Sequence, residues 1–408
     1  MRPSCAPLMV VVVLLTGCAD APSSSAASDT GPGSSDDAVT VDGRPPTDGA
    51  ATRDVTAESD APGVETDGGR SDAPATGFGL LSSGLRDKTK WPFAIDSIWN
   101  TPIGSGAVYE PAGTKVTSVS GSTTHFGQDE DIIVMRPTAP RIDVAFNGVG
   151  WSGGDRCPAG SKVLHSVPVP SSFTIPSSGE NNGAAFLAAD GHTVLQDQPF
   201  TRCTAGGPAT ALVTAVDQDI YGPGMLGAHG GSGLSAIGGT LRVGELGAGV
   251  IHHALKVNLW AKQYYHCCDH HWPAITHDGY ADPTTYGGSN PDFGPGTLLA
   301  LRPSFDLTTL RTKPARILAQ ALIDYGAYVA DDSFWNDWSL ETELGPDGRV
   351  VTEFQTLFGF SMRPADGEPF KLDVDAIFAA LQIVKNSAAT SVGGGGAPRV
   401  ALAPAIGN

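Results

Sequence analysis

A strict alternation of side chains over residues 251–262 constrains the fold more than any other stretch of this chain. Successive side chains of a β-strand point to opposite faces of a sheet, so a period of two predicts a strand. The mostly apolar face carries Ile251, His253, Leu255, Val257, Leu259 and Ala261. The opposite face carries His252, Ala254, Lys256, Asn258, Trp260 and Lys262. The stretch therefore predicts one long strand with its first face in a core and its second face open to solvent.

The residues before this strand predict a turn and a hairpin. The run HGGSG at 229–233 is typical of a tight turn, because glycine adopts backbone conformations that other residues avoid. Thr240 and Arg242 share one phase of the short strand that follows, and 246–250 would close a hairpin onto the long strand. In that pairing Arg242 joins the polar row.

This polar row predicts a binding site for a sugar that carries carboxylates. Removing the proton next to a uronate carboxylate needs a base and a cation, which neutral His252 and Arg242 would supply. Glu245 would orient these groups or act as the acid, and Trp260 would stack on a sugar ring. The predicted catalytic residues are therefore His252, Arg242 and Glu245, and the predicted substrate-binding residues are Lys256, Asn258, Trp260 and His229.

Other acidic and phenolic groups leave alternatives open. Glycoside hydrolysis needs two carboxylates roughly 5–9 Å apart. Glu245 would be one of them, with a partner among Glu341, Glu343, Asp331 and Asp332. Residues 338–344 alternate as a strand would and place Glu341 and Glu343 on one face, whereas 331–332 is expected to be a loop after a helix. A tyrosine acid would come from Tyr264, Tyr265, Tyr280 or Tyr286.

The run HCCDHH at 266–271, with His277 and Asp278 close by, is dense in metal-ligand types and leaves a metal-binding surface protein as a further alternative. Its spacing matches no structural zinc pattern, so we expect no metal ion and no cofactor. Four cysteines remain after the N-terminal segment, and an even number in an exported chain favours disulfides: Cys157, Cys203, Cys267 and Cys268. A bridge between the two adjacent cysteines is less easily formed than pairs with the other two.

The N-terminus reads as an export signal. A short apolar run at 8–15 ends in Leu15-Thr16-Gly17-Cys18, which resembles the lipobox of bacterial lipoproteins. The resemblance implies a signal peptide at 1–17, lipidation of Cys18 and attachment to the bacterial cell envelope, at the outer membrane or cell surface. Residues 18–76 are rich in Ser, Asp, Pro and Gly and nearly free of large apolar side chains, which predicts a disordered acidic tether.

The net charge of −18 excludes one class of partner. About half of it lies in the tether, yet the remainder is still acidic, which argues against binding nucleic acid. Contact with the membrane is expected through the lipid alone.

Many short strands separated by Gly and Pro predict a mainly β fold, a β-sandwich or jelly roll, over residues 77–387 as one domain. Two peripheral helices are expected, one from Pro314 to about Gly326 and one capped by Asp373. The run 388–408, with four consecutive glycines, is expected to be a flexible tail.

Several short motifs occur together: SIWN at 97–100, HGGSGLSAIGG at 229–239, RVGEL at 242–246, HALK at 253–256, WPA at 272–274 and DYGAYVADD at 324–332. Together they resemble a family of secreted bacterial and fungal β-rich proteins, over most of residues 91–360. The resemblance implies an extracellular role related to carbohydrate.

The sequence thus predicts a surface-anchored lipoprotein that acts on extracellular polysaccharide, as a lyase or glycoside hydrolase of uronate-containing glycan. The alternative of a different class is a glycan-binding or adhesive module without catalysis.

Overall fold

The computed structural model describes residues 77–119 and 122–407. The expected signal peptide, the lipidation site Cys18 and the tether lie outside these residues. None of the helices in the described part is both long and apolar enough to cross a membrane.

Most of the strands form one mixed sheet of twelve. They are β1 (Tyr109–Pro111), β4 (His125–Val134), β7 (Ala184–Leu187), β8 (Thr193–Gln198), β10 (Val213–Thr214), β11 (Gln218–Asp219), β12 (Leu255–Leu259), β13 (Leu298–Ala300), β14 (Ala327–Asp332), β15 (Asp337–Gly345), β16 (Gly348–Arg349) and β17 (Gln382–Val384). The order is β1-β17-β13-β14-β12-β15-β4-β7-β8-β10, with β11 beside β8 and β16 beside β15. The expectation of a mainly β fold is confirmed.

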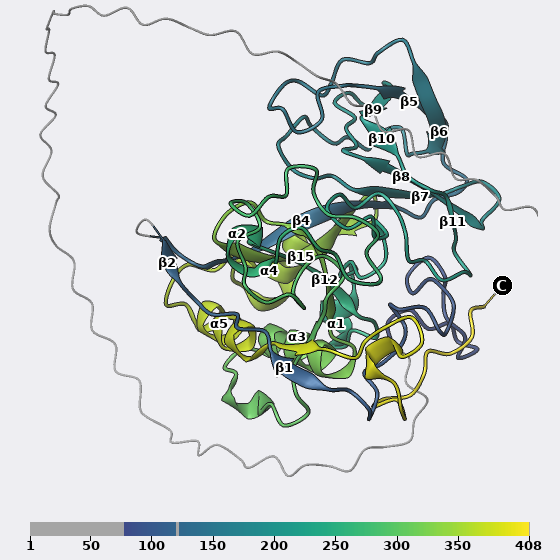
Figure 1. Ribbon diagram of the computed structural model, residues 1–408. Helices are drawn as coiled ribbons and strands as arrows, with labels where there is room; N and C mark the ends of the chain where they lie inside the picture. Colours follow the sequence, from purple (N-terminus) through teal and green to yellow (C-terminus); the bar gives the residue numbers. More distant parts are fainter. Residues whose placement is uncertain (1–76, 120–121, 408) are drawn as a thin grey trace, which may run out of the picture. The chain divides into compact units, whose positions relative to one another are not determined.

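A second sheet of three strands packs on one end of the large sheet (Figure 1). Its strands are β5 (Arg141–Phe146), β6 (Val163–Pro168) and β9 (Ala209–Ala211). Apolar side chains of this sheet meet those of β4 and β7 in one cluster, which includes Val144, Val167, Ile132 and Phe186. The two sheets therefore form a sandwich at this end. The remaining pair, β2 (Ser118–Val119) and β3 (Ser122–Thr123), is a separate ribbon.

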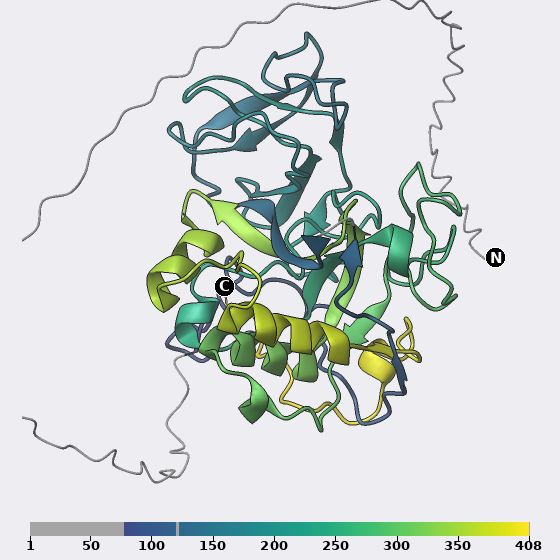
Figure 2. The same cartoon turned by 90° about the vertical axis from the view of Figure 1, so that its left-hand side faces the viewer.

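Helices cover one face of the large sheet. They are α1 (Glu245–Ala248), α2 (Ala261–Tyr264), α3 (Lys313–Asp324), α4 (Val350–Phe358) and α5 (Pro369–Ala380), with two 3₁₀ turns at Leu307–Thr309 and Val392–Gly394. The helices α3 and α5 lie side by side (Figure 2). Their apolar side chains share a core with Val257 of β12, Leu340 of β15 and Val329 of β14. The opposite face of these same strands carries polar side chains, among them Asn258 of β12 and Asp331 of β14.

The helix predictions succeed where local signals are strong. Pro314 lies in the first turn of α3, and Gly326 follows its end with φ +79°, a conformation that favours glycine. The second predicted helix is α5, but it begins at Pro369. Asp373 therefore caps no helix: it is buried inside α5 and accepts hydrogen bonds from the backbone N–H groups of Arg311 and Thr312.

Two expectations about the organising stretch are wrong. The long strand covers only Leu255–Leu259, and helix α2 begins at Ala261. The hairpin turn is the short helix α1, between two glycines of positive φ. Leu241 still makes a bridge to Thr342, so the preceding segment reaches the sheet through β15 and not through β12.

The disulfide prediction is confirmed for the four cysteines but not for their pairing. Cys157 bonds to Cys203, with 5.6 Å between Cα atoms, and Cys267 bonds to its neighbour Cys268. Cys157 and Cys203 both lie in connections of the three-stranded sheet, whereas the adjacent pair follows α2. The fold thus brings together the pair that is distant in sequence and leaves each adjacent cysteine with its neighbour.

The C-terminal run is not a flexible tail. Gly393 to Gly396 all have positive φ and form turns against residues 102–107. The backbone N–H of Arg399 donates to Ile103 O, and Arg86 exchanges backbone hydrogen bonds with Ala405 and Gly407. The glycines that suggested disorder allow the C-terminal segment to lie close against the backbone of residues 102–107.

Candidate active site

A cleft of about 1070 Å³ opens over the polar face of the central strands. Its lining includes side chains from β4, β12, β14 and β15, the loop before β7, the glycine-rich turn and the segment 277–280. A cavity of this size accommodates a small-molecule or oligosaccharide ligand.

The floor of the cleft is a polar row across four adjacent strands. Asn258 of β12 is in register with Asp331 of β14 on one side and Ser339 of β15 on the other. Two residues further along β15, Glu341 is in register with Asp129 of β4. A register shift after Val257 brings Asp331 opposite Asn258. Period-two alternation therefore puts carboxylates and amides on the face opposite the helices.

Two amide side chains link the carboxylates of this floor. Asn181 Nδ2 donates to Asp129 Oδ2 at 2.7 Å and to Asp331 Oδ2 at 3.3 Å. Asn258 Nδ2 donates to Glu341 Oε1 at 2.6 Å and lies 3.5 Å from Asp129 Oδ2. Each amide therefore holds two carboxyl groups close together.

His229 closes the set into a ring. Its Nε2 lies 3.0 Å from Glu341 Oε1, and its Nδ1 faces Gly230 O at 3.4 Å and Asp331 Oδ2 at 3.6 Å. Burial lowers the pKa of His229, so its imidazole is neutral. A neutral imidazole that donates from Nδ1 accepts at Nε2, so a protonated Glu341 is the matching donor.

Burial also raises the pKa values of the carboxyl groups in this ring. The pKa values of Asp129 and Asp331 lie well above the usual range, because both groups are desolvated and neighbouring carboxylates repel their charge. Burial raises the pKa of Glu341 to about 7. Groups that interact this closely titrate together, so the ring holds protons at neutral pH.

These shifts make stability depend on pH in an unusual direction. Burial raises the pKa of Glu341 and of Asp337 to about 7 and that of Asp131 to about 6. In the unfolded chain such groups ionise near pH 4. The folded state binds more protons across this window, so the contribution of these three groups to the free energy of unfolding is largest below pH 4 and falls as the pH rises through 7. Glu341 alone contributes on the order of 3 kcal/mol.

Urea unfolding at pH 5 and pH 8 measures this dependence. We expect the protein to be more stable at pH 5, and we expect Glu341→Gln to flatten the difference because glutamine has no proton to release. Stability that rises from pH 5 to pH 8 would contradict the assignment of protonated carboxyl groups to the floor.

Below the ring lies a buried ion pair. Lys256 Nζ lies 2.8 Å from both Asp131 Oδ2 and Ser235 O. Asp131, His229 and Glu341 each offer a ligand atom within 4.8 Å of the others, which is close enough to hold a metal ion. The Lys256 ammonium already supplies positive charge among these carboxylates, so we assign no metal ion to them.

The glycine-rich turn lies directly against the floor. Gly231 has φ +65°, and a Cβ added there would lie 2.3 Å from Asp331 Oδ1 and 3.2 Å from Asp331 Cα. A larger residue at this position would therefore displace the carboxyl group or the turn. The predicted tight turn is confirmed, and its glycine permits the backbone to touch a floor residue.

Exposed aromatic side chains line the mouth of the cleft. Phe334 is 76% exposed and Trp335 57%, while Trp151 and Tyr280 are 47% and 44% exposed. Trp335 stacks on His125 with 5.4 Å between ring centroids. Large aromatic side chains left open beside a cleft are typical of surfaces that bind ligands.

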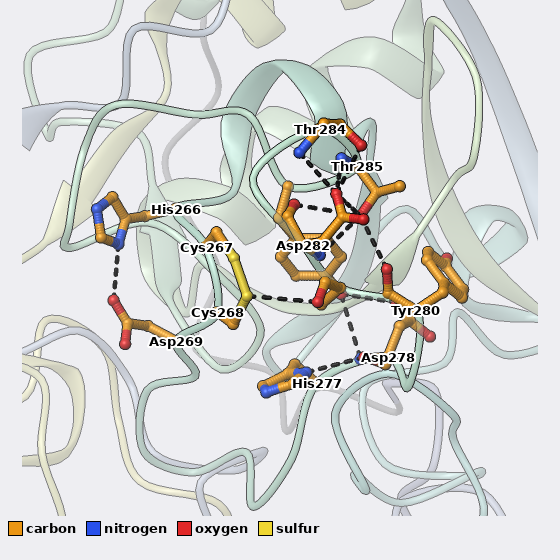
Figure 3. The surroundings of a disulfide bond; sticks show 12 residues. His266, Cys267, Cys268, Asp269, His277, Asp278, Tyr280, Asp282, Thr284 and Thr285 are labelled. Carbon is orange, nitrogen blue, oxygen red and sulfur yellow. Dashed lines mark hydrogen bonds and ion pairs between the residues drawn. A yellow bond between two sulfur atoms is a disulfide. The ribbon is translucent and has the colours of Figure 1, made fainter. Parts of the chain in front are cut away.

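The segment 277–280 at the rim of the cleft lies in a loop held by local hydrogen bonds and by the disulfide between the neighbouring residues Cys267 and Cys268 (Figure 3). A cis peptide bond joins Cys267 and Cys268. The Cys268 sulfur lies 3.4 Å from the carbonyl oxygen of Ala281. Asp282 accepts hydrogen bonds from the backbone N–H groups of Thr284 and Thr285. The segment thereby keeps Tyr280 and Asp278 at the rim. Because the disulfide uses both thiols, the metal-binding interpretation of 266–271 loses two of its ligands.

The predicted catalytic residues Arg242 and Glu245 lie in a separate buried network. Arg242 Nε donates to Glu343 Oε2 at 2.9 Å. Glu245 accepts from the backbone N–H of Arg242 and pairs with His253 Nε2 at 3.1 Å. None of these four side chains lines the cleft.

The expectation that Arg242, His252 and Lys256 share one solvent-facing row is wrong. His252 stacks on Trp91 with 4.9 Å between ring centroids, and Lys256 is fully buried against Asp131. The physical reason is that β12 is a central strand, covered on its polar face by the glycine-rich segment as well as on its apolar face by helices.

The predicted substrate-binding residues have different fates. Asn258 lines the cleft, and His229 lies just beneath its floor. Trp260 is half-buried against the core beside the helices. Of the predicted second carboxylates, Asp331 and Asp332 line the cleft and Glu341 joins the ring, whereas Glu343 pairs with Arg242. Residues 331–332 end strand β14, so the expected loop is wrong.

Asp129 and Asn181 were missed by sequence reasoning. Asp129 and Asp131 alternate within HFGQDED, directly before the apolar run of β4, and this pattern would have signalled a strand with acids on one face. Asn181 lies in a loop, where no local pattern marks it.

Comparisons with protein-family models, curated proteins and solved structures give no significant match. The function is therefore inferred from the site itself.

Proposed function

We propose that this protein is a glycoside hydrolase that cleaves extracellular polysaccharide. The observation that carries the proposal is a close pair of carboxyl groups, Asp129 and Asp331, on the floor of an open cleft with exposed aromatic side chains at its mouth. Glycoside hydrolysis uses two carboxyl groups beside the scissile bond, and aromatic faces pack on sugar rings.

The two carboxyl groups differ in their surroundings. Asp331 is nearly fully buried, and its pKa is raised well above the usual range by desolvation and by the neighbouring carboxylates. We assign it as the general acid, since a protonated carboxyl group is needed for the leaving oxygen. Burial raises the pKa of Asp129 as well, but Asp129 is less buried than Asp331 and accepts the shorter hydrogen bond from Asn181, so it is the group of the pair that ionises more readily. We assign Asp129 as the nucleophile.

The spacing of this pair supports a retaining mechanism. One carboxyl oxygen of Asp129 lies 2.7 Å from Asn181 Nδ2, and one of Asp331 lies 3.3 Å from the same nitrogen. The distance between these two oxygens is therefore at most the sum of the two lengths. Inverting enzymes leave about 6.5–9.5 Å between the two groups to admit a water molecule, whereas retaining enzymes leave about 5–5.5 Å.

Elimination on a uronate has less support. That reaction needs a cation beside the substrate carboxylate, but Arg242 and Lys256 are tied to buried carboxylates away from the lining. Arg363, the single lysine or arginine of the described lining, donates to the backbone oxygen of Gln128. We further propose that the enzyme acts at the bacterial cell surface, attached by lipid at Cys18, because the lipobox precedes a long acidic stretch.

Incubating the protein with a panel of neutral, amino and uronate glycans tests the proposal. We expect new reducing ends without the ultraviolet absorbance of unsaturated sugars, and proton NMR of the first product should show the anomeric configuration of the substrate. Unsaturated ends would establish a lyase in place of a hydrolase. Retention on a glycan column without cleavage would establish the binding module instead.

A further inference from the structure

The charged side chains that line the cleft are almost all acidic. Six carboxyl groups belong to the lining: Asp129, Glu180, Asp278, Asp331, Asp332 and Asp337. Arg363 is the single arginine or lysine among the described lining residues, and it donates to Gln128 O at 3.0 Å. Clefts lined by one sign of charge concentrate ligands of the opposite sign, and they repel chains of the same sign.

Two buried oxygen acceptors of the lining have no donor among the described residues. They are Asn258 Oδ1 and Asp337 Oδ1, on side chains that are 2% and 4% exposed. An unmatched acceptor costs free energy unless a ligand brings a donor. Asp337 precedes Glu341 by four residues on β15, about 13 Å along the strand at ~3.3 Å per residue. The lining therefore offers unmatched acceptors to hydrogen-bond donors of a ligand along its length, and not only beside Asp129 and Asp331.

We propose that the substrate is a cationic glycan, a polymer of amino sugars with free ammonium groups, which the acidic lining selects over its neutral and anionic counterparts. An ammonium group brings three donors and no acceptor, so it complements carboxylates and lone acceptors at once. The exposed rings of Trp335 and Trp151 also attract cations through their faces. A polyuronate adds negative charge to a cleft that is already acidic. This inference rests on the proposed hydrolase function and narrows its substrate.

The burial of the floor sharpens this preference. Asp337 and Asp331 are almost entirely shielded from water, and at such buried positions the attraction between opposite charges is stronger than at an exposed surface. Burial raises both pKa values, that of Asp337 to about 7 although the charge of Arg363 opposes the rise, so neither carboxyl group has a cation that fully matches its charge. A bound ammonium group supplies that match.

Binding of matched hexasaccharides to the full-length Asp331→Asn protein tests the inference without turnover. The probes are the hexamers of glucosamine and of N-acetylglucosamine and a hexuronate, compared at pH 6 by calorimetry. We expect the glucosamine hexamer to bind at least about tenfold more tightly than the acetylated one in 20 mM salt. The advantage should shrink to about threefold or less in 0.5 M salt, because the screening length shortens.

Two substitutions locate the effect. Asp337→Asn should weaken binding of the glucosamine hexamer about three- to tenfold and leave the acetylated hexamer unchanged. Asp96→Asn, which removes an exposed carboxylate outside the lining, should change neither.

The outcomes separate this inference from the proposed function. Equal binding of the two hexamers, or tighter binding of the hexuronate, would overturn the cationic substrate. If the wild-type protein then still releases reducing ends from a neutral glycan, the hydrolase stands. Preferential, salt-sensitive binding of the glucosamine hexamer without any cleavage by the wild-type protein would support the ligand class and overturn the hydrolase.

Discussion

Replacing Asp331 by asparagine is expected to lower kcat about 10²–10⁴-fold, the usual worth of a positioned proton donor. Asparagine keeps the size of the side chain but has no acidic proton for the leaving oxygen. KM should change little, because the lining is otherwise intact. The substitution also removes one of several mutually repelling carboxyl groups, so the melting temperature of the variant should equal or exceed that of the wild type.

The control for this variant is Asp324→Asn. Asp324 is a half-buried carboxyl group whose pKa is also raised, but it lies at the end of α3 outside the cleft. It should leave kcat unchanged. Activity of Asp331→Asn within threefold of the wild type would show that another group donates the proton.

Replacing Lys256 by methionine is expected to destabilise the protein by about 3–5 kcal/mol at pH 7, the cost of leaving a buried charge without its partner. Lys256 is fully buried, and Asp131, its partner at 2.8 Å, is 1% exposed. Methionine keeps the aliphatic length but leaves the carboxylate with no cation. Urea unfolding at pH 7 measures the loss.

Two comparisons identify its cause. The double variant Lys256→Met with Asp131→Asn should recover part of the loss, since no buried charge remains. Lys385→Met removes exposed ion pairs with Glu110 and Asp292 and should destabilise the protein far less, because solvent screens exposed charges. If the single variant at Lys256 is as mild as the one at Lys385, the buried pair does not stabilise the fold.

The sequence predicts where the helices and strands of this fold lie along the chain better than it predicts which elements pack against one another. Alternation correctly places Lys256 and Asn258 on one face of a strand and Glu341 with Glu343 on one face of another. Local signals also locate α3 and the glycine turn, because proline and glycine act over a few residues. No local pattern tells that β12 is central or that a loop covers its polar face, so buried side chains were expected to meet solvent.

The candidate site shows the same limit. Asn258 and the carboxylates Asp331 and Asp332 were recognised as chemistry-bearing residues, but the first was placed with the wrong partners and the acids in a loop. What decides the site is strand order, since β14, β12, β15 and β4 are neighbours in space and far apart in sequence. The alternation of Asp129 with Asp131 marks a strand with acids on one face, but no local pattern tells that Asp129 lies beside Glu341 in the sheet.

The parallel pairing of β4 with β15 also dictates when the cleft comes into being. It joins residue 129 to residue 341, so the floor needs a contact between an early and a late segment of the polypeptide. Such distant pairings form slowly, because a long loop must close before any contact rewards it. A nascent or truncated chain that stops before β15 already contains Asn181, His229 and Asn258, but it lacks Glu341 and the strand that joins β12 to β4. The candidate site is therefore complete only after β15 has been synthesised and has paired with β4.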